Sequence, residues 1–159
     1  MKKKMNKNIN LRKANGTDFI CVKKLMQSVQ DLHHYNRRDI HKDSEIFDEE
    51  EFYQSINDII VAETNGTVVG VVKHLFKEKA ENNYTNYRKV LFIDALSVDA
   101  NYRKKGIGKI LMLEMEKMSK DNNCSSVELN VWAFNENAIK FYEGMGMSVK
   151  TMILEKNIK

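Results

Sequence analysis

Two glycines and a group of cations follow an apolar segment, residues 90–98, in the second half of the chain. Gly106 and Gly108 lack a Cβ atom, so the backbone at these positions can approach a bulky anion closely. If a helix begins here, its first free N–H groups and the positive end of its dipole face that anion. Four side chains supply cationic donors around it: Arg103, Lys104, Lys105 and Lys109. The segment predicts an anion site suited to a diphosphate, and a plain glycine turn beside surface lysines is the alternative.

Two common phosphate-binding motifs do not fit this segment. A Walker loop requires Gly-x-x-x-x-Gly-Lys-Ser/Thr, which the sequence lacks. A dinucleotide-binding fingerprint requires a third glycine, and Leu111 occupies its place. A nucleotide-phosphate binder therefore stays only as a third interpretation, which competition by ATP or NAD would reveal.

The elements that must position this site follow from periodicity and turn residues. Alternating or continuous apolar patterns predict six strands: 9–11, 59–63, 68–75, 90–98, 127–131 and 147–154. Helical spacing and capping residues predict four helices: 17–32, 49–56, 107–118 and 135–142. Asn65-Gly66 supplies the positive φ angles of a tight hairpin turn, whereas residues 77–89 form a long polar loop.

The resulting order of elements is β-α-α-β-β-β-α-β-α-β. It predicts a mixed α/β (α+β) fold with about four helices on a twisted, mostly antiparallel sheet of six to seven strands. Residues 9–159 are expected to form a single domain, preceded by a basic flexible tail over residues 1–8.

The glycine segment resembles a known family motif. Val98-(x)4-Arg103-x-x-Gly106-x-Gly108 is similar to the Arg/Gln-x-x-Gly-x-Gly/Ala motif of the GNAT N-acetyltransferase superfamily. Residues 135–147, NENAIKFYEGMGM, resemble the family's Asn-x-x-Ala-x-x-x-Tyr-x-x-x-Gly-Phe segment, with Met in place of the final Phe. The two motifs occur in the family's order, and the resemblance extends over nearly the whole chain.

The resemblance implies acetyl-CoA as acyl donor and no metal. Backbone groups of seven consecutive residues would bind the pyrophosphate: Arg103, Lys104, Lys105, Gly106, Ile107, Gly108 and Lys109. By the same resemblance, Val98 would pair its main chain with the pantetheine arm and the Leu96 N–H group would polarise the thioester carbonyl. Asn135 would hold the pantetheine, and Tyr142 would serve as general acid.

Acyl transfer to an amine makes chemical demands that these residue types can meet. The amine must lose a proton before it attacks, the thioester oxygen needs a hydrogen-bond donor, and the thiolate needs a proton. A tyrosine can supply that last proton. Asp94, an acid in an otherwise apolar strand, is the candidate base, and a desolvated Asp would have a raised pKa. The alternative role of Asp94 is to anchor the substrate or a neighbouring backbone group.

Residues for the acceptor side are less defined. Residues 43–51 carry six acids and no base, which would favour a cationic amine if they form the rim of the acceptor slot. The alternative is that these acids stabilise the first turn of a helix. His34, Tyr84 and Asp94 are candidate substrate residues, and Trp132 could line the mouth or simply pack. Cys124 is interpreted as a turn residue rather than a nucleophile.

Composition narrows the class of protein. The net charge of the 159-residue chain is +4, but residues 1–13 alone carry +6, so the remainder is slightly acidic and does not predict a nucleic-acid surface. No apolar run is long enough to span a membrane. Two distant cysteines, Cys21 and Cys124, indicate a reducing compartment, and we expect a cytoplasmic protein.

The sequence therefore favours an acetyl-CoA-dependent N-acetyltransferase acting by direct transfer to a small amine or a peptide, with a cationic small amine preferred. A protein N-terminal or lysine acetyltransferase, and a non-catalytic acetyl-CoA sensor, are the alternatives. Neither nucleic acid nor membrane is expected as a partner, and a homodimer is possible.

Overall fold

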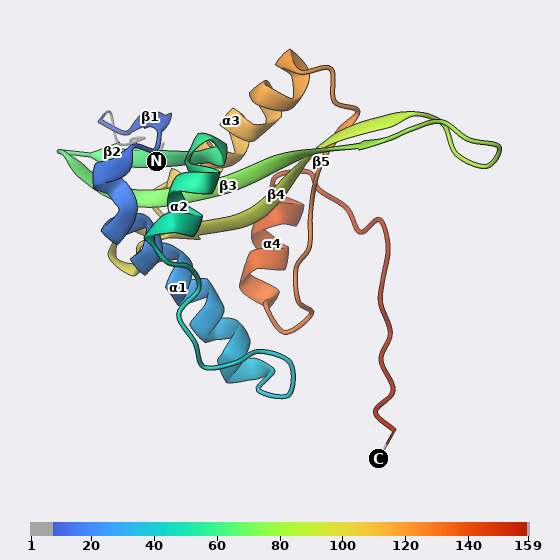
Figure 1. Cartoon of the computed structure of the whole chain (residues 1–159), viewed down its shortest axis with the longest axis horizontal. Coiled ribbons are helices and arrows are strands. Elements are labelled where there is room, and N and C mark those ends of the chain that lie inside the picture. The colour runs from blue at the N-terminus through green and yellow to red at the C-terminus, as the bar shows by residue number, and fades with distance from the viewer. Residues whose placement is uncertain (1–7, 159) are drawn as a thin grey trace, which may run out of the picture.

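A computed structural model describes residues 8–158, which form a five-stranded sheet with helices packed on it (Figure 1). The strands are β1 (Asn10–Lys13), β2 (Ile59–Thr64), β3 (Thr67–Lys79), β4 (Arg88–Val98) and β5 (Ser126–Leu129). The helices are α1 (Phe19–Asn36), α2 (Glu49–Ser55), α3 (Ile107–Asp121) and α4 (Glu136–Gly144). Short 3-10 helices are η1 (Gly16–Asp18), η2 (Ile56–Asp58) and η3 (Ala100–Tyr102). The predicted mixed α/β class is confirmed, while the predicted tail lies outside the described residues except for Asn8.

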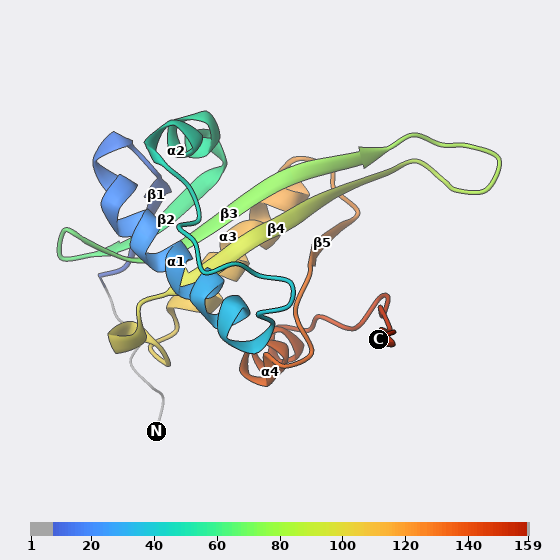
Figure 2. The same cartoon turned by 60° about the horizontal axis from the view of Figure 1, so that its bottom comes forward.

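The strands lie side by side in chain order. Neighbours from β1 to β4 pair antiparallel, and β4 pairs with β5 in parallel. Asn65 and Gly66 have φ values of 48° and 75°, so the predicted tight turn joins β2 to β3. The long β3–β4 hairpin extends well beyond the rest of the sheet (Figure 2). Its strands take in residues 77–79 and 88–89 of the predicted 77–89 loop, which leaves residues 80–87 between them.

Helices cover both faces of the sheet, and each face has its own apolar core (Figure 2). On the face of α1 and α2 the buried side chains are Val22, Leu25, Met26, Phe52, Ile59, Val61 and Val71. On the face of α3 they are Ile60, Ala62, Val69, Val72, Leu91, Ile93, Ile107, Leu111, Met112 and Met115. Alternate residues of β2 point to opposite cores, as strand geometry requires. The two cores hold the central strands rigidly between helices.

The prediction of a final strand over residues 147–154 is wrong, and so is the sheet of six to seven strands. Residues 147–158 have no regular structure and run away from the sheet edge (Figure 1). Ile153 and Leu154 are 97% and 92% exposed. Apolar alternation describes what a strand would bury, but it does not supply the neighbouring strand that pairs with it. Here the adjacent strand, β5, offers only four residues.

Candidate acyl-transfer site

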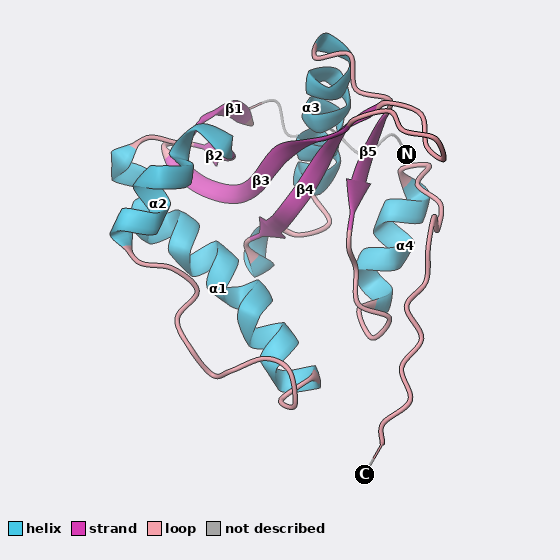
Figure 3. Cartoon of the chain, turned by 45° about the vertical axis from the view of Figure 1, so that its right-hand side comes forward, coloured by secondary structure: helices cyan, strands magenta, loops and turns pink. Residues whose placement is uncertain are grey.

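Half of β4 has a free edge. Its parallel pairing with β5 begins at Val90 and ends where Ile93 faces Leu129, after which the two strands diverge (Figure 3). Beyond that point, β3 is the only strand among residues 8–158 that pairs with β4, and the last paired residues are Val98 of β4 and Gly70 of β3. The main-chain groups on the other edge are therefore available to an extended ligand.

The direction of these main-chain groups follows from the register. Asp99 donates its N–H to the carbonyl oxygen of Val69 at 2.9 Å, so the main-chain N–H of Asp99 points toward β3. Because successive residues of a strand point to opposite edges, Leu96 and Val98 turn their N–H and C=O groups toward the free edge. The side chain of Arg103 is in line with this, since its Nε donates to the Val98 carbonyl oxygen at 3.1 Å.

A β-bulge lies at the beginning of this free edge. Lys73 faces Ala95 and His74 faces Ile93, so Asp94 has no partner in β3. The extra residue changes the alternation of side chains, and both Asp94 and Ala95 line the pocket beneath α1. The bulge therefore places a carboxylate next to the free edge and on the same face as α1.

The turn after β4 leads into α3 with a left-handed residue at its start. Gly106 has φ 88° and Lys104 has φ 60°, and a glycine meets the first of these without strain. The first backbone bond of the helix runs from Ile110 N–H to the Gly106 oxygen, so the N–H groups of 107–109 have no acceptor within the helix. The segment predicted to bind an anion thus forms the N-terminus of α3, which follows the free edge of β4 in the chain.

Two close approaches fix the position of this helix N-terminus. A Cβ atom at Gly70 in β3 would lie 2.8 Å from Ile107 Cγ2, and one at Gly108 would lie 3.2 Å from Phe141 Cζ. Gly70 therefore allows α3 to pack closely on the sheet, and Gly108 allows α4 to pack closely on α3. Sequence analysis gave Gly108 a phosphate-binding role and overlooked Gly70.

Helix α4 carries the other two predicted cofactor residues. Asn135 caps the helix, and its Oδ1 accepts from Ala138 N–H at 3.3 Å. Tyr142 packs against the core on the α3 side, next to the ring of Phe141. Burial raises the pKa of the Tyr142 phenol above its ordinary value of 10.0. The phenol therefore keeps its proton throughout the neutral range.

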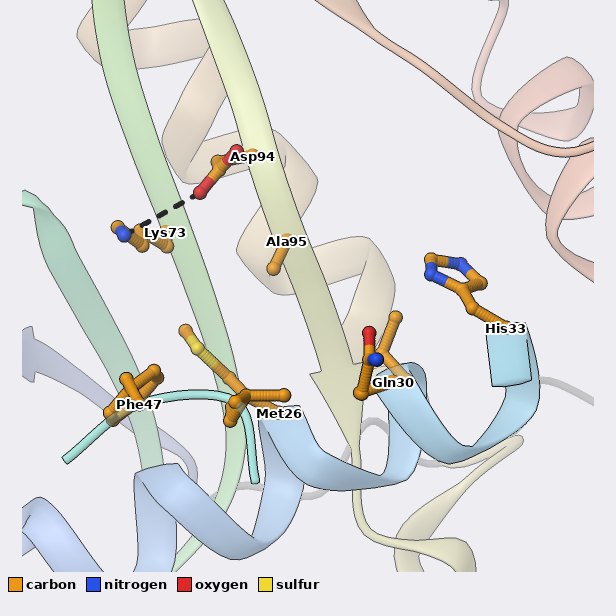
Figure 4. A pocket seen from close by; sticks show the side chains of 9 residues that line it. Met26, Gln30, His33, Phe47, Lys73, Asp94 and Ala95 are labelled. Carbon is orange, nitrogen blue, oxygen red and sulfur yellow. Dashed lines mark ion pairs between the residues drawn. The ribbon is translucent and has the colours of Figure 1, made fainter. Parts of the chain in front are cut away.

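A cavity of about 240 Å³ lies between α1 and the bulge of β4 (Figure 4). Its apolar lining residues are Met26, Val29, Ile46, Phe47 and Ala95, and its polar ones are Gln30, His33, Lys73 and Asp94. The Lys73 Nζ atom lies 3.5 Å from Asp94 Oδ2. The pocket thus adjoins the free edge through Asp94 and Ala95, which belong to both.

Comparison with known proteins agrees with this geometry. The sequence pattern of the acetyltransferase (GNAT) family matches residues 23–147, which include β4, the α3 N-terminus and α4. The chain belongs to the GNAT acetyltransferase family.

Two curated relatives match the chain over about half its length. N-alpha-acetyltransferase 60 of Xenopus tropicalis is 29% identical over 97 residues, which cover 53% of this chain and 40% of the relative. N-acetylaspartate synthetase of Xenopus tropicalis is 37% identical over 86 residues, which cover 54% of this chain and 29% of the relative. The match therefore spans less than half the length of either relative.

Solved structures share the GNAT fold over nearly the whole chain. A tetramutant of the BH1408 protein from Bacillus halodurans has a TM-score of 0.90 at 22% identity, covering 94% of this chain and 99% of that one. The aminoglycoside N-acetyltransferase AAC(6')-Iy in complex with CoA has a TM-score of 0.68 at 15% identity, covering 94% and 99%. At these identities the likeness shows the fold alone.

The GNAT fold places some predicted acceptor residues away from the pocket. Tyr84 is 94% exposed in the loop at the tip of the β3–β4 hairpin and does not line the pocket. His34 turns its Nδ1 to the carbonyl oxygen of His41 at 2.8 Å, whereas its neighbour His33 lines the pocket. Along α1 a one-residue step changes the direction of a side chain by about 100°, so the sequence alone did not distinguish these two histidines.

Asp94 is in the predicted place but not in the predicted environment. Its side chain is 47% exposed and lies close to a cation, so it is not a desolvated carboxylate. Sequence analysis overlooked that cation, Lys73, although a lysine following the apolar run of residues 68–72 was a signal for a polar group on the sheet face.

The acidic side chains before and within α2 do not line the pocket. Asp48 caps α2 with its Oδ1 on Glu51 N–H at 3.0 Å, and Glu51 Oε2 accepts from Asp48 N–H at 3.1 Å. Glu45 pairs with Lys23. Only the apolar Ile46 and Phe47 of this segment reach the pocket. The helix-capping interpretation holds for Asp48 and Glu51, and the acids provide no charged lining for a cationic acceptor.

An aromatic cluster surrounds His33 near the α1 C-terminus. Ring centroids lie 5.0 Å apart for His33 and His41, 5.4 Å for His41 and Trp132, and 5.8 Å for the stacked pair Trp132 and Phe134. Burial and the neighbouring His41 lower the pKa of His33 below its ordinary value. The cluster ties α1 to the segment that precedes α4, and it gives Trp132 a packing role.

Two further features concern the described residues as a group. Within residues 8–158, no three His, Cys, Asp or Glu side chains are gathered as metal ligands would be. None of the helices in that part of the chain has the length and apolarity to cross a bilayer.

Proposed function

We propose that this GNAT protein is an N-acetyltransferase that moves the acetyl group of acetyl-CoA directly onto the primary amine of a small molecule. The observation that carries the proposal is the free edge of β4 between a helix N-terminus and a pocket. One extended ligand with a phosphate end and an acyl end can follow that edge from the α3 N-terminus to Asp94. The CoA complex of AAC(6')-Iy, which shares the fold, supports the choice of ligand.

The residues present fit CoA at both ends. The N–H groups of 107–109 and the dipole of α3 suit a pyrophosphate, and Arg103, Lys104, Lys105 and Lys109 are exposed around them. Main-chain groups of Leu96 and Val98 suit the amides of the pantetheine arm, with the Arg103 side chain leaving the Val98 oxygen when the ligand binds. Asn135 keeps its Nδ2 for the same arm, since only its Oδ1 is used in capping α4.

Bound acetyl-CoA supplies an activated acetyl group with a thiolate as leaving group. In the proposed reaction the amine nitrogen forms a bond to the acetyl carbon, and the carbon–sulfur bond breaks. Leu96 N–H donates to the carbonyl oxygen as negative charge develops there. Asp94, directly or through water, takes the proton that the amine loses, and the Tyr142 hydroxyl gives its proton to the sulfur. Proton exchange with solvent then restores both side chains.

Calorimetry with acetyl-CoA and CoA tests the binding half of the proposal. We expect saturable one-to-one binding that neither ATP nor NAD displaces. Absence of binding to well-folded protein would overturn the proposal, and displacement by ATP or NAD would favour a nucleotide-phosphate binder.

An acceptor screen tests the chemical half. The protein is incubated with acetyl-CoA and a panel of amines, amino acids and peptides, with free thiol measured and products weighed by mass spectrometry. We expect thiol release that depends on one class of acceptor, with the mass gain of one acetyl group. Binding of acetyl-CoA without transfer to any acceptor would favour a non-catalytic sensor instead.

A further inference from the structure

The acceptor pocket contains one cation and one anion side by side. Lys73 of β3 and Asp94 of β4 lie 3.5 Å apart between Nζ and Oδ2, on the pocket face of the sheet (Figure 4). His33 adds no full charge at neutral pH, because burial lowers its pKa. The lining as a whole is therefore formally neutral. Such a pocket does not select a polycation, which would need an excess of acids.

Asp94 lies closer to the free edge of β4 than Lys73 does, and this order indicates which end of an acceptor each charge would meet. Asp94 lies at the beginning of that edge, whereas Lys73 belongs to β3, on the opposite side of β4. An amine that approaches the thioester beside Leu96 N–H therefore meets Asp94 first. Any group attached next to the amine and pointing back under α1 comes within reach of Lys73 Nζ. The group that matches a lysine ammonium there is a carboxylate.

The remaining walls and the size of the pocket restrict the rest of the acceptor. Five of its nine lining residues are apolar: Met26, Val29, Ile46, Phe47 and Ala95. The volume of about 240 Å³ is below the range of roughly 300–1,000 Å³ that drug-sized ligands occupy. A mostly apolar lining offers few hydrogen-bond partners to the many polar groups of an aminoglycoside. A single amino acid with an apolar side chain fits both the size and the walls.

We infer that the acceptor is an apolar amino acid whose ammonium group pairs with Asp94 and whose carboxylate pairs with Lys73. The inference rests on the proposed function and narrows it. Both charged groups of such an acceptor are bonded to one carbon atom. This spacing suits the two protein charges, whose Lys73 Nζ and Asp94 Oδ2 atoms are 3.5 Å apart. Binding replaces one direct ion pair by two, with alternating charges, so neither protein charge is left uncompensated.

Three acceptors that differ only at the carboxylate test this inference: L-leucine, L-leucinamide and isopentylamine. We expect kcat/KM for leucine to exceed that for each of the other two by about tenfold or more, the usual effect of a charge-assisted hydrogen bond. The amine of leucinamide is less basic than that of leucine, so intrinsic reactivity favours the amide and works against the expected order. Equal or inverted preference would overturn the inference while leaving the proposed function intact.

The variant Lys73→Gln tests whether Lys73 causes the preference for an acceptor with a carboxylate. We expect the leucine-to-leucinamide ratio of kcat/KM to fall close to one, mainly through a higher KM for leucine. Lys77→Gln is the matched control, since Lys77 is on the same strand but its Nζ lies 3.1 Å from the centroid of the Phe92 ring, outside the pocket. This control should keep the wild-type ratio. A preference that survives in Lys73→Gln would overturn the role of Lys73.

Acetyl-CoA binding is measured by calorimetry for every variant. Unchanged affinity shows that the variant is folded and that the cofactor side is intact, so a lost preference belongs to the acceptor side. If the wild-type protein binds acetyl-CoA and transfers acetyl groups only to acceptors without a carboxylate, the inference about the acceptor is wrong and the proposed function still holds. If it acetylates no amine, the proposed function fails, and the inference fails with it.

Discussion

Gly108 in the first turn of α3 lies directly against the ring of Phe141 in α4: a Cβ atom at Gly108 would be 3.2 Å from Phe141 Cζ. This contact joins the two halves of the candidate site, because the proposed anion cradle is at the start of α3 and α4 carries Tyr142. The packing of two helices therefore favours a glycine here, in addition to the proposed access to a phosphate. Separation of those two roles is possible by mutation.

Gly108→Ala should leave the free energy of unfolding within about 1 kcal/mol of the wild-type value, because the helix propensity that alanine gains offsets the movement of the ring by a few tenths of an ångström. The same change should also weaken acetyl-CoA binding several-fold by displacing α4. In a Phe141→Leu background the alanine should cost less, since the smaller side chain leaves room. Denaturant unfolding of the four proteins of this cycle measures the coupling. Strictly additive effects would show that the contact is not what requires the glycine.

Gly106 and Gly66 provide a matched pair for the left-handed backbone. Their φ values are 88° and 75°, and a Cβ atom would meet nothing within 4 Å at either position. Alanine at each should cost about 1–2 kcal/mol of stability through backbone strain alone. Only Gly106→Ala should also lower acetyl-CoA affinity, by roughly tenfold, because only Gly106 begins α3. Calorimetry measures the affinity of each variant for acetyl-CoA. Equal affinities in the two variants would show that Gly106 has no part in binding the pyrophosphate.

Tyr142→Phe should lower kcat by at least about a hundredfold, as loss of a general acid does, with little change in acetyl-CoA affinity. Because burial raises the pKa of Tyr142, the wild-type enzyme should lose activity through this group only above about pH 10. Tyr102→Phe is the control, since Tyr102 packs against the same core beneath Lys105. Equal losses of kcat and of affinity in Tyr142→Phe would assign Tyr142 to binding rather than to proton transfer.

Stability should fall as the pH falls below about 6.5. Burial lowers the pKa of both His33 and His74 in the folded protein, so below that pH the unfolded state binds more protons. The stabilisation is therefore complete above the unfolded-state pKa, is lost as the pH falls through the folded-state values, and then levels off. Melting temperatures between pH 8 and 5 measure the effect. His33→Gln should make the dependence shallower, and an unchanged slope would contradict the assignment.

Local patterns predicted the parts of the site that depend on residues close together in the chain. The glycine turn, the α3 helix after it and the short helix that begins next to Asn135 each need only a few neighbouring residues, and all three are present in the structure. The Asn65-Gly66 hairpin is another case, because two positive φ angles are decided by the two residues that adopt them.

Long-range features escaped the same reasoning. Residues 147–154 alternate as a strand does, yet no neighbouring strand accepts them. Tyr84 was a candidate for the acceptor site, but the extended β3–β4 hairpin carries it away from the pocket. In both cases the outcome depends on which segments lie next to one another, which periodicity does not encode.

By itself, the sequence determined the order of elements as far as α4, the glycine turn before α3 and the pair of motifs that mark a GNAT protein, since each is set by residues close together in the chain. Only the tertiary structure decided that Lys73 lies beside Asp94 and that His33 rather than His34 reaches the pocket. The physical reason is register: one unpaired residue in β4 reverses the direction of every later side chain, and a one-residue step on α1 turns a side chain to another face.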